Sequence, residues 1–371
     1  MEARWWRHFD YLLLVACLLL VGFGLAMIYS ASMATLSSEA KIWDTPVARQ
    51  AIYALVGLMG MFFMVLVDYR VLASLAPALY VIMVGLLSVI LVLGQTTYGA
   101  RRWLEISVLP LQPSEAAKLV LILVLAKFLA GNYTQGKSLS GLAFSGLMAL
   151  VPAALIYFQP HLSAVLVILS LWLGMVLVAG VRWRYLGVGA AIALVVGPFA
   201  YFQLLHEYMK ERIGAFLNPV ADPMGVGYNM LQAQISVGSG GLLGKGYLQG
   251  TQSQLYFLRV QTTDFVFSVL GEELGFVGVV VLFALFALLL FRSLRVAALA
   301  ADPLGRLVAV GVVVTVAVQI FIHVGSNVGL IPVAGVPLPF ISYGGSSLIS
   351  LLTGMGILQS IVLHHRKIEF A

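Results

Sequence analysis

Long blocks of apolar residues alternate with short polar connections along this sequence. Ten of these blocks have roughly the 20 residues that an α-helix needs to cross about 30 Å of hydrocarbon. They lie approximately at 11–29, 47–67, 71–93, 115–130, 141–158, 162–180, 186–205, 265–291, 307–324 and 346–363. The pattern therefore predicts an all-α integral membrane protein of about ten transmembrane helices.

Basic residues gather in alternate connections, as the positive-inside bias of membrane proteins requires. Counted from a cytoplasmic N-terminus, these connections carry Arg70, Lys127, Lys137, Arg182, Arg184, Arg292, Arg295 and Arg306, with Arg366 and Lys367 after the last block. The first block is longer than a signal-peptide core and similar blocks follow it, so we expect a retained helix. The prediction is a multi-pass membrane protein with both termini in the cytoplasm.

Composition agrees with a membrane domain and argues against other classes. Hydrophobic residues make up 61% of the 371 positions and charged residues only 10%, with a mean hydropathy of +1.02. Soluble domains carry about 25% charged residues. The net charge of +6 follows from the positive-inside bias, so no nucleic-acid partner is expected. Cys17 stands alone, which excludes a disulfide or a thiolate metal site within the chain. We expect a single membrane domain over 1–371.

The remaining connections lie on the opposite face of the membrane. The largest is an extracytoplasmic loop at about 206–264, between helices 7 and 8. The others lie at 30–46, 94–114, 159–161 and 325–345. Loops of such length inside a compact protein are usually functional or disordered. No internal repeat is visible, which argues against an inverted-repeat transporter.

Two groups of charged residues stand near the predicted fourth helix. Arg101 and Arg102, in GARRWLE, suit phosphate binding but could equally anchor the chain at the membrane interface beside Trp103. Glu115 and Lys118, in QPSEAAK, share a helix face at the i, i+3 spacing and can pair. That pair is either structural or part of a functional site.

The loop at 206–264 offers two further cations. Arg212 lies on a predicted short amphipathic helix that ends at Asn218 and Pro219. Lys245 lies among many glycines, whose backbone amides can approach an anion. The same glycines would also suit a loop that lies flat on the membrane surface, and the spacing is not that of a nucleotide P-loop.

Acidic residues surround the start of the predicted eighth helix. Asp264, in QTTDF, could be an ordinary N-cap of that helix. Glu272 and Glu273 lie about 12 Å further into the span and must be paired, protonated or facing a wet cavity. The later segment GLIPVAGVPLPFISYGGSS, with its prolines and glycines, predicts a cavity wall near Ser342, Gly344 and Gly345.

These segments together resemble one family, the SEDS proteins of bacterial shape, elongation, division and sporulation. The likeness runs through GARRWLE, QPSEAAK, ERIGAFLNP, DPMGVGYNMLQ, SVGSGGLLGKGYLQGTQSQL, TDFVFSVLGEELGFVG and PVAGVPLPFISYGGSS. Within the family, the match through GTQSQL and the compact length are most like the member for rod elongation.

The resemblance implies ten helices with cytoplasmic termini and the activity of a peptidoglycan glycosyltransferase. Such an enzyme polymerises lipid II into a nascent glycan strand at the outer face of the cytoplasmic membrane. The essential aspartate of the family falls on Asp264, which we expect to be the general base. The residues expected to bind substrate are Arg101, Arg102, Glu115, Lys118, Arg212, Lys245 and Ser342.

The resemblance also implies a class B penicillin-binding protein, a transpeptidase, as partner, beside the surrounding membrane lipids. A divalent cation such as Mg²⁺, held between Asp264 and pyrophosphate, stays open because Mg²⁺ often binds through few carboxylates plus phosphates. The sequence shows no dedicated metal cage. Two rival functions remain: a flippase that moves lipid II across the membrane, and a non-catalytic scaffold that activates the penicillin-binding protein.

The chain departs from the family pattern at three places. It has QPHLSA, with His161, where the family usually has QPDLGT. Arg259, Val260 and Thr262 stand before Thr263 and Asp264 where PExHTDF is common, and His323 stands in place of a usual asparagine. No role is carried over from the family to these positions.

Overall fold

The structure is a computed structural model that describes residues 9–364 apart from several gaps. The gaps are 34–42, 44, 94, 98–99, 107–108, 132–137, 186, 188, 190, 192–193, 196–202, 204, 206 and 222–224. Side chains are also left undescribed at 93–111.

Nine long helices form the body of the described chain. They are α1 (Tyr11–Met33), α2 (Pro46–Leu66), α3 (Tyr69–Leu93), α4 (Pro113–Gly131), α5 (Leu139–Phe158), α6 (Leu162–Val178), α11 (Val266–Leu299), α12 (Pro303–Asn327) and α13 (Gly345–Leu363). Seven of them are long and apolar enough to cross a membrane, and α6 is a shorter apolar helix. The expected class, a multi-pass helical membrane protein, is confirmed.

Each of the nine helices coincides with one of the ten predicted blocks. The remaining block, 186–205, falls largely outside the described residues. The count of ten and the position of the large loop relative to it therefore stay predictions. The predicted block at 265–291 is too short, because α11 continues to Leu299.

Short elements join the long helices. Between α6 and α11 lie α8 (Glu207–Leu217), the 3₁₀ helix η3 (Pro219–Ala221), α9 (Val226–Ser239) and α10 (Thr251–Gln254). The predicted loop at 94–114 instead contains a small antiparallel sheet of β1 (Gln95–Thr97), β2 (Ala100–Ile106) and β3 (Leu109–Leu111), in the order β1-β2-β3. This small sheet lies in one connection, and the fold class remains all-α.

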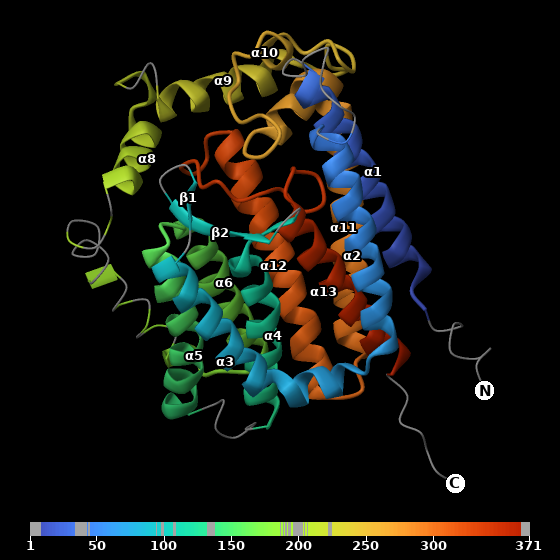
Figure 1. The fold of residues 1–371 in the computed structure, drawn as a ribbon, viewed down its shortest axis with the longest axis vertical. Coiled ribbons are helices and arrows are strands. Elements are labelled where there is room, and N and C mark those ends of the chain that lie inside the picture. The colour runs from blue at the N-terminus through green and yellow to red at the C-terminus, as the bar shows by residue number, and fades with distance from the viewer. Residues whose placement is uncertain are drawn as a thin grey trace.

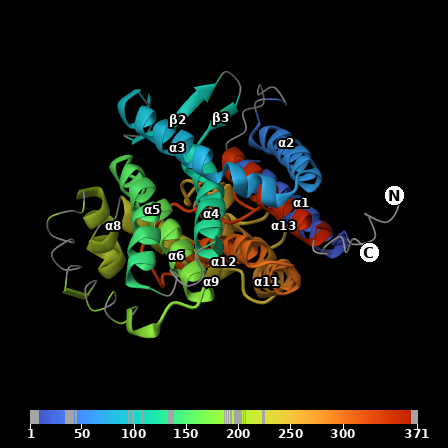
Figure 2. The same cartoon turned by 90° about the horizontal axis from the view of Figure 1, so that it is seen from below.

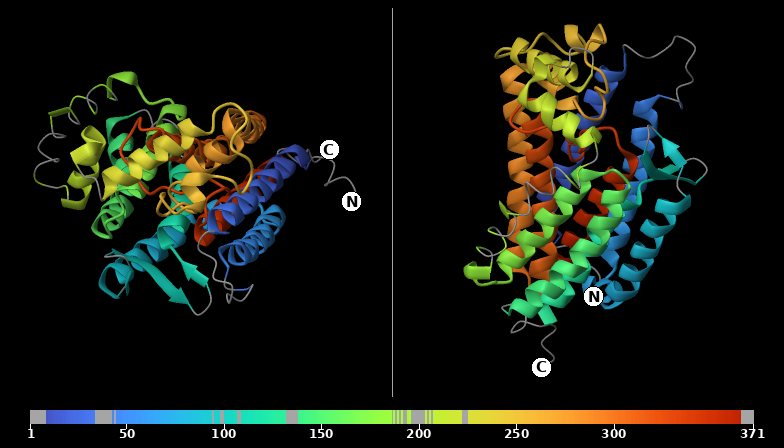
Figure 3. Two further views of the ribbon diagram at one scale, coloured as in Figure 1. Left: turned by 90° about the horizontal axis from the view of Figure 1, so that it is seen from above. Right: turned by 90° about the vertical axis from the view of Figure 1, so that its left-hand side faces the viewer.

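The long helices run side by side, and the short helices α8, α9 and α10 cross one end of the bundle (Figure 1). The described ends of the chain lie toward the other end. Seen along the bundle, α4 and α12 lie between α5 and α6 on one side and α1, α2 and α13 on the other (Figure 2). The two further views in Figure 3 show the sheet beside α3 and the short helices above the bundle.

Burial along the helices agrees with that arrangement. In α12 and α13, 72% and 83% of the most apolar stretch is buried, against 22% in α3. Gly356 of α13 lies so close to the Met61 carbonyl of α2 that a larger side chain would collide with the backbone. Small residues at such contacts let membrane helices pack closely.

Ion pairs connect the helices at the end opposite α8–α10. Arg292 of α11 donates to the Asp10 carboxylate, which precedes α1, at 2.7 Å. Tyr69 and Arg70 of α3 donate to the carboxylate of Asp302, which caps α12 through the Gly305 amide. Burial tends to raise the pKa of Asp302, but the hydrogen bonds from Gly305, Tyr69 and Arg70 outweigh it and hold this pKa below its usual value.

Candidate functional site

A cavity of about 610 Å³ lies between the start of α6, helix α8 and the last two turns of α12. The irregular segment from Ile331 to Gly335, which follows α12, supplies another part of its wall. The polar side chains around it are His161, Ser163, Ser170, Tyr208, Arg212 and Asp264. Two of the predicted site residues, Arg212 and Asp264, therefore meet in one cavity although 51 other residues separate them in the sequence.

The Asp264 carboxylate and the Arg212 guanidinium converge on one point beside Gly335. A methyl group at Gly335 would lie 3.6 Å from Asp264 Oδ2 and 3.7 Å from Arg212 Nη1. Gly335 has a φ of +67°, a conformation that glycine adopts without strain. The glycine thus brings the backbone close to both charged groups and leaves the space between them open.

Asp264 is held by its backbone rather than by a place in a helix cap. The N-cap position of α11 falls on Phe265, so the N-cap alternative for Asp264 is wrong. Asn327 Nδ2 donates to the Asp264 carbonyl at 2.9 Å, and Ser342 Oγ donates to the preceding Thr263 carbonyl at 2.7 Å. The carboxylate is therefore positioned by α12 and by the Pro/Gly-rich segment before α13.

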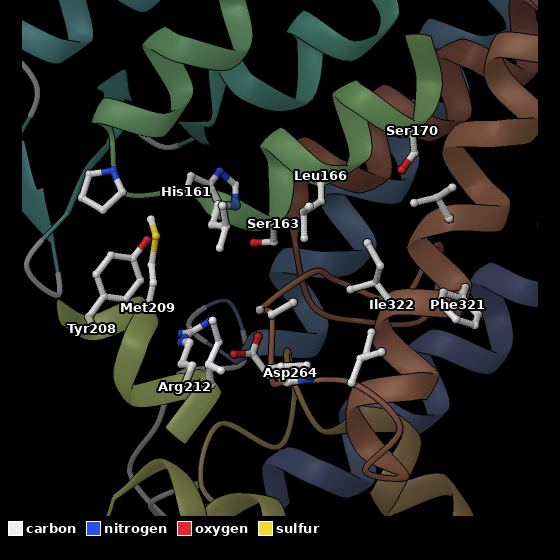
Figure 4. A pocket seen from close by; sticks show the side chains of 18 residues that line it. His161, Ser163, Leu166, Ser170, Tyr208, Met209, Arg212, Asp264, Phe321 and Ile322 are labelled. Atoms are coloured by element: carbon white, nitrogen blue, oxygen red, sulfur yellow. The ribbon is translucent and has the colours of Figure 1, made fainter. Parts of the chain in front are cut away.

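Arg212 comes from α8, which ends before Asn218 and Pro219 as the sequence predicts. Its Nη1 donates to the Val333 carbonyl at 3.0 Å, and its guanidinium lies 5.9 Å from the centre of the Tyr208 ring. One hydrogen bond leaves further donors of the guanidinium for an anion. Figure 4 shows Arg212 directed toward Asp264.

His161 and Ser163 lie on the wall across the cavity from Asp264 and Arg212 (Figure 4). His161 Nδ1 is 3.4 Å from Gln112 Nε2 and 3.5 Å from Ser114 Oγ, so polar side chains at the start of α4 orient the imidazole. The cavity wall thereby joins the QPSEAAK segment to the QPHLSA segment.

The rest of the cavity is apolar and reaches the outside of the helix bundle. Leu166 of α6 and Val318, Phe321 and Ile322 of α12 line this part. Leu166 and Phe321 are 44% and 63% exposed. In a membrane protein such side chains face lipid, so the cavity is polar at one end and opens toward hydrocarbon at the other.

Glu115 and Lys118 form the predicted ion pair, which lies away from this cavity. Lys118 Nζ is 2.8 Å from the Glu115 carboxylate, and both side chains are only 5% exposed. The pair borders a second space of about 20 Å³, also lined by Thr315 and Ser350, which is enough for a single water molecule. The geometry of the pair is confirmed, whereas its role in substrate binding stays a hypothesis.

Lys245 also has a buried partner. Its Nζ is 2.7 Å from Glu272 Oε1, and Glu272 is fully buried. The amides of Lys245 and Gly246 donate to the Glu272 and Glu273 carbonyls. These groups, which the sequence offered for an anion, are therefore engaged with α11.

Three other predicted residues lie outside the cavity lining or outside the described side chains. Ser342 supports Thr263 from behind, and the predicted wall at Ser342, Gly344 and Gly345 is instead formed by Ile331–Gly335. Arg101 and Arg102 belong to strand β2, but their side chains lie outside the described residues.

A divalent cation would find few protein ligands here. The described residues contain no cluster of three or more histidine, cysteine, aspartate or glutamate side chains. Among the described residues that line the cavity, Asp264 is the sole carboxylate. A metal ion at Asp264 would therefore need most of its ligands from a phosphate-bearing substrate and from water.

Sequence reasoning missed Asn327, Ser163 and Tyr208. Asn327 uses both amide hydrogens and its oxygen in the link between α12 and the start of α11. The sequence does contain a hint of its role, because Asn327 lies in GSNVGL, directly before the Pro/Gly-rich segment. Ser163 and Tyr208 carry no comparable signal, because an isolated serine or tyrosine is common in membrane helices and loops.

The fold and the cavity define a multi-pass membrane protein whose candidate site joins a polar, charged end to an apolar opening. The chain belongs to the family of cell cycle proteins represented by FtsW, RodA and SpoVE, whose family model matches residues 11–367. The family expected from the sequence motifs is thereby confirmed.

Several relatives are similar over nearly the whole chain. The peptidoglycan glycosyltransferase MrdB of Escherichia coli K12 is 37% identical over 362 residues, which is 98% of this chain and 95% of MrdB. The crystal structure of the rod shape determining protein RodA of Thermus thermophilus has a TM-score of 0.70 at 32% identity, over 95% of this chain and 96% of that one.

A third relative was solved as part of an assembly. It comes from a peptidoglycan synthase complex described as coordinating polymerization and crosslinking. Its TM-score is 0.82 at 32% identity, with 95% of this chain and 97% of that chain covered.

Proposed function

We propose that this chain is a peptidoglycan glycosyltransferase that polymerises lipid II during cell elongation, with Asp264 as its general base. One observation carries the assignment of the site: Asp264 and Arg212 converge at the polar end of a cavity that opens to lipid at its other end. A polyprenyl-linked sugar diphosphate has the same division into a polar head and an apolar chain. The relatives named as peptidoglycan glycosyltransferases support the same activity.

The glycosyl transfer needs one general base and one group that stabilises negative charge. The C4 hydroxyl oxygen of the acceptor sugar attacks the anomeric carbon of the donor while the bond to the lipid diphosphate breaks. The hydroxyl proton passes to the Asp264 carboxylate, and the diphosphate leaves with the electron pair of the broken bond. A positioned base typically contributes about 10²–10⁴-fold to such a step. This single displacement inverts the anomeric centre.

Arg212 is the described cation best placed for the leaving diphosphate. It shares the cavity with Asp264, and guanidinium groups bind phosphate oxygens in pairs. Arg101 and Arg102 remain proposed substrate ligands on β2. A divalent cation between Asp264 and the diphosphate would add charge stabilisation, and it would take most of its ligands from substrate and water.

The proposed setting is the outer face of the cytoplasmic membrane, with both termini in the cytoplasm and the whole chain forming one membrane domain. A class B penicillin-binding protein would crosslink the strands. The solved peptidoglycan synthase complex, which couples polymerization to crosslinking, supports a partner of that kind.

A reconstituted polymerisation assay tests the proposal. The purified chain and a class B penicillin-binding protein with a blocked transpeptidase site are supplied with lipid II and Mg²⁺, and glycan products are resolved on a gel. Asp264→Asn should lower polymerisation by roughly 100-fold or more, because the amide cannot accept the proton. Glu207→Gln is the control, since the Glu207 side chain on α8 is 82% exposed and outside the cavity lining.

The same assay separates the rival functions. Polymer formation at wild-type rate by Asp264→Asn would overturn the role of Asp264. A folded wild-type complex that makes no polymer, but moves labelled lipid II across vesicle membranes, would favour the flippase. A complex that does neither, while its partner gains activity, would favour the scaffold.

A further inference from the structure

The start of α6 borders the cavity with an unusual set of residues. His161 occupies the N-cap position, and Leu162 and Ser163 begin the helix. All three line the cavity that contains Asp264. The local sequence is QPHLSA, so an imidazole and a hydroxyl stand side by side at this end of the helix.

The N-terminus of α6 has backbone donors to offer. Ala164 and Val165 donate to the His161 carbonyl, so the N–H groups of Leu162 and Ser163 precede the helical hydrogen-bond ladder. The His161 side chain makes no cap hydrogen bond with them. The helix dipole adds partial positive charge at this end, which favours an anion.

Ser163 gives independent evidence for a ligand. The residue is only 4% exposed, and its hydroxyl forms no hydrogen bond with any described part of the chain. Figure 4 shows this hydroxyl directed into the cavity. Because the hydroxyl faces the cavity and no hydrogen bond to the described protein occupies it, it can bond a bound molecule.

His161 and Arg212 complete a ring of donors. Gln112 and Ser114 orient the imidazole from the side of α4, and the ring lies across the cavity from Arg212. The described charged side chains that line the cavity are Arg212 and Asp264. The start of α6 thus adds donors without adding a second carboxylate.

We propose that the start of α6 binds the diphosphate of the polyprenyl-linked substrate. The N–H groups of Leu162 and Ser163, the Ser163 hydroxyl and the His161 imidazole would donate to its oxygens from one wall, and Arg212 from the other. The inference deepens the proposed function and rests on it for the identity of the ligand. It assigns to His161 and Ser163 a role in substrate affinity rather than in proton transfer.

Binding of a short substrate mimic tests this site without any catalysis. The probe is farnesyl diphosphate, titrated against the full chain in nanodiscs of neutral lipid. Ser163→Ala should weaken binding about tenfold, because a hydrogen bond to a charged group is lost. His161→Asp should weaken it roughly 100-fold, because a carboxylate would repel the diphosphate and compete for the helix N–H groups.

Two comparisons make the result specific. Ser88→Ala applies the same change on α3, outside the cavity lining, and should leave the affinity unchanged. Farnesol, inorganic pyrophosphate and phosphatidylglycerol replace the probe in parallel titrations. Tight binding of farnesyl diphosphate alone assigns the site to a polyprenyl diphosphate, whereas equal binding of phosphatidylglycerol would assign it to membrane lipid and overturn the proposal.

Wild-type affinity in both Ser163→Ala and His161→Asp would also overturn it. Ser163→Ala keeps the test decisive if the histidine variant misfolds, because it removes a hydroxyl that has no partner in the described protein. The proposed function fails separately, through polymerisation by Asp264→Asn, and that assay does not depend on this binding measurement.

Discussion

Asn327 shows how a single buried amide can set the position of the proposed base. Its Nδ2 donates to the carbonyls of Asp264 and His323 at 2.9 and 2.8 Å. Its Oδ1 accepts from the amide and the hydroxyl of Ser268. The side chain is fully buried, so each of these bonds forms away from water and fixes the start of α11 against the end of α12.

Asn327→Asp should therefore disturb the reaction without removing a group that touches substrate. The new carboxylate oxygen would face the carbonyls of Asp264 and His323, and Asp264 would shift. We expect kcat to fall roughly 10–100-fold while KM for lipid II stays within about twofold, since misplacement of a base affects the transition state most. Steady-state polymerisation kinetics on protein with an intact thermal transition measure this. Equal losses in kcat and in thermal stability would instead assign Asn327 a purely structural role.

For single residues, the sequence indicates a role where a motif or a charge pattern surrounds the residue. Asp264 is predicted to be the base because TDFVFSVLGEELGFVG resembles a known family, and Arg212 is predicted to bind an anion because it is a cation on a predicted amphipathic helix. Asn327 and Ser163 were not named, because their roles depend on which backbone groups the fold leaves nearby. Those distances arise from contacts between segments far apart in the chain.

The glycine-rich segment after α9 anchors the loop to α11. Gly275 interrupts α11 with a φ of +62°, and Gly244 packs against this break with a φ of +78°. Phe276 and Val277 donate to the carbonyls of Gly241 and Leu242. The backbone donors and acceptors freed by the break in α11 are thus used by the loop, and the Lys245–Glu272 pair adds a charged bond to that contact.

Removing the Lys245 charge should destabilise this anchor. Lys245→Met leaves a fully buried Glu272 without its cation, which we expect to cost about 3 kcal/mol of unfolding free energy. Adding Glu272→Met should recover most of that loss. Thermal unfolding in detergent measures both. Lys210→Met is the control and should change stability by less than about 0.5 kcal/mol, because its partner Glu207 is 82% exposed.

The opposite result would restore the role that the sequence suggested for Lys245. A Lys245→Met protein with unchanged stability and weakened binding of farnesyl diphosphate would make Lys245 a substrate ligand.

Most long helices could be predicted, because each apolar block must satisfy its own backbone hydrogen bonds in lipid. The strands β1–β3 could not, since they are three to seven residues long and lie in a segment that reads as a loop. The end of α11 was also missed, because its final turns carry Arg292 and Arg295 and no longer look apolar.

In the whole molecule, the packing of the helices brings residues that are far apart in the sequence to the wall of one amphipathic cavity. The sequence predicted that polar connections gather on one side of the membrane. It did not predict that α6, α8, α12 and the Ile331–Gly335 segment enclose a common space of about 610 Å³. That result depends on packing angles between helices, which the order of apolar blocks does not specify.

Photo-crosslinking shows whether the lipid-linked substrate occupies this cavity. A photoreactive phenylalanine replaces Phe321, which lines the cavity and is 63% exposed, or Phe276, which lies on α11 outside the cavity lining and is 60% exposed. After irradiation with labelled lipid II, we predict strong labelling at position 321 and little at position 276. Equal labelling at both positions, or none at 321 in an active protein, would show that the substrate does not occupy this cavity.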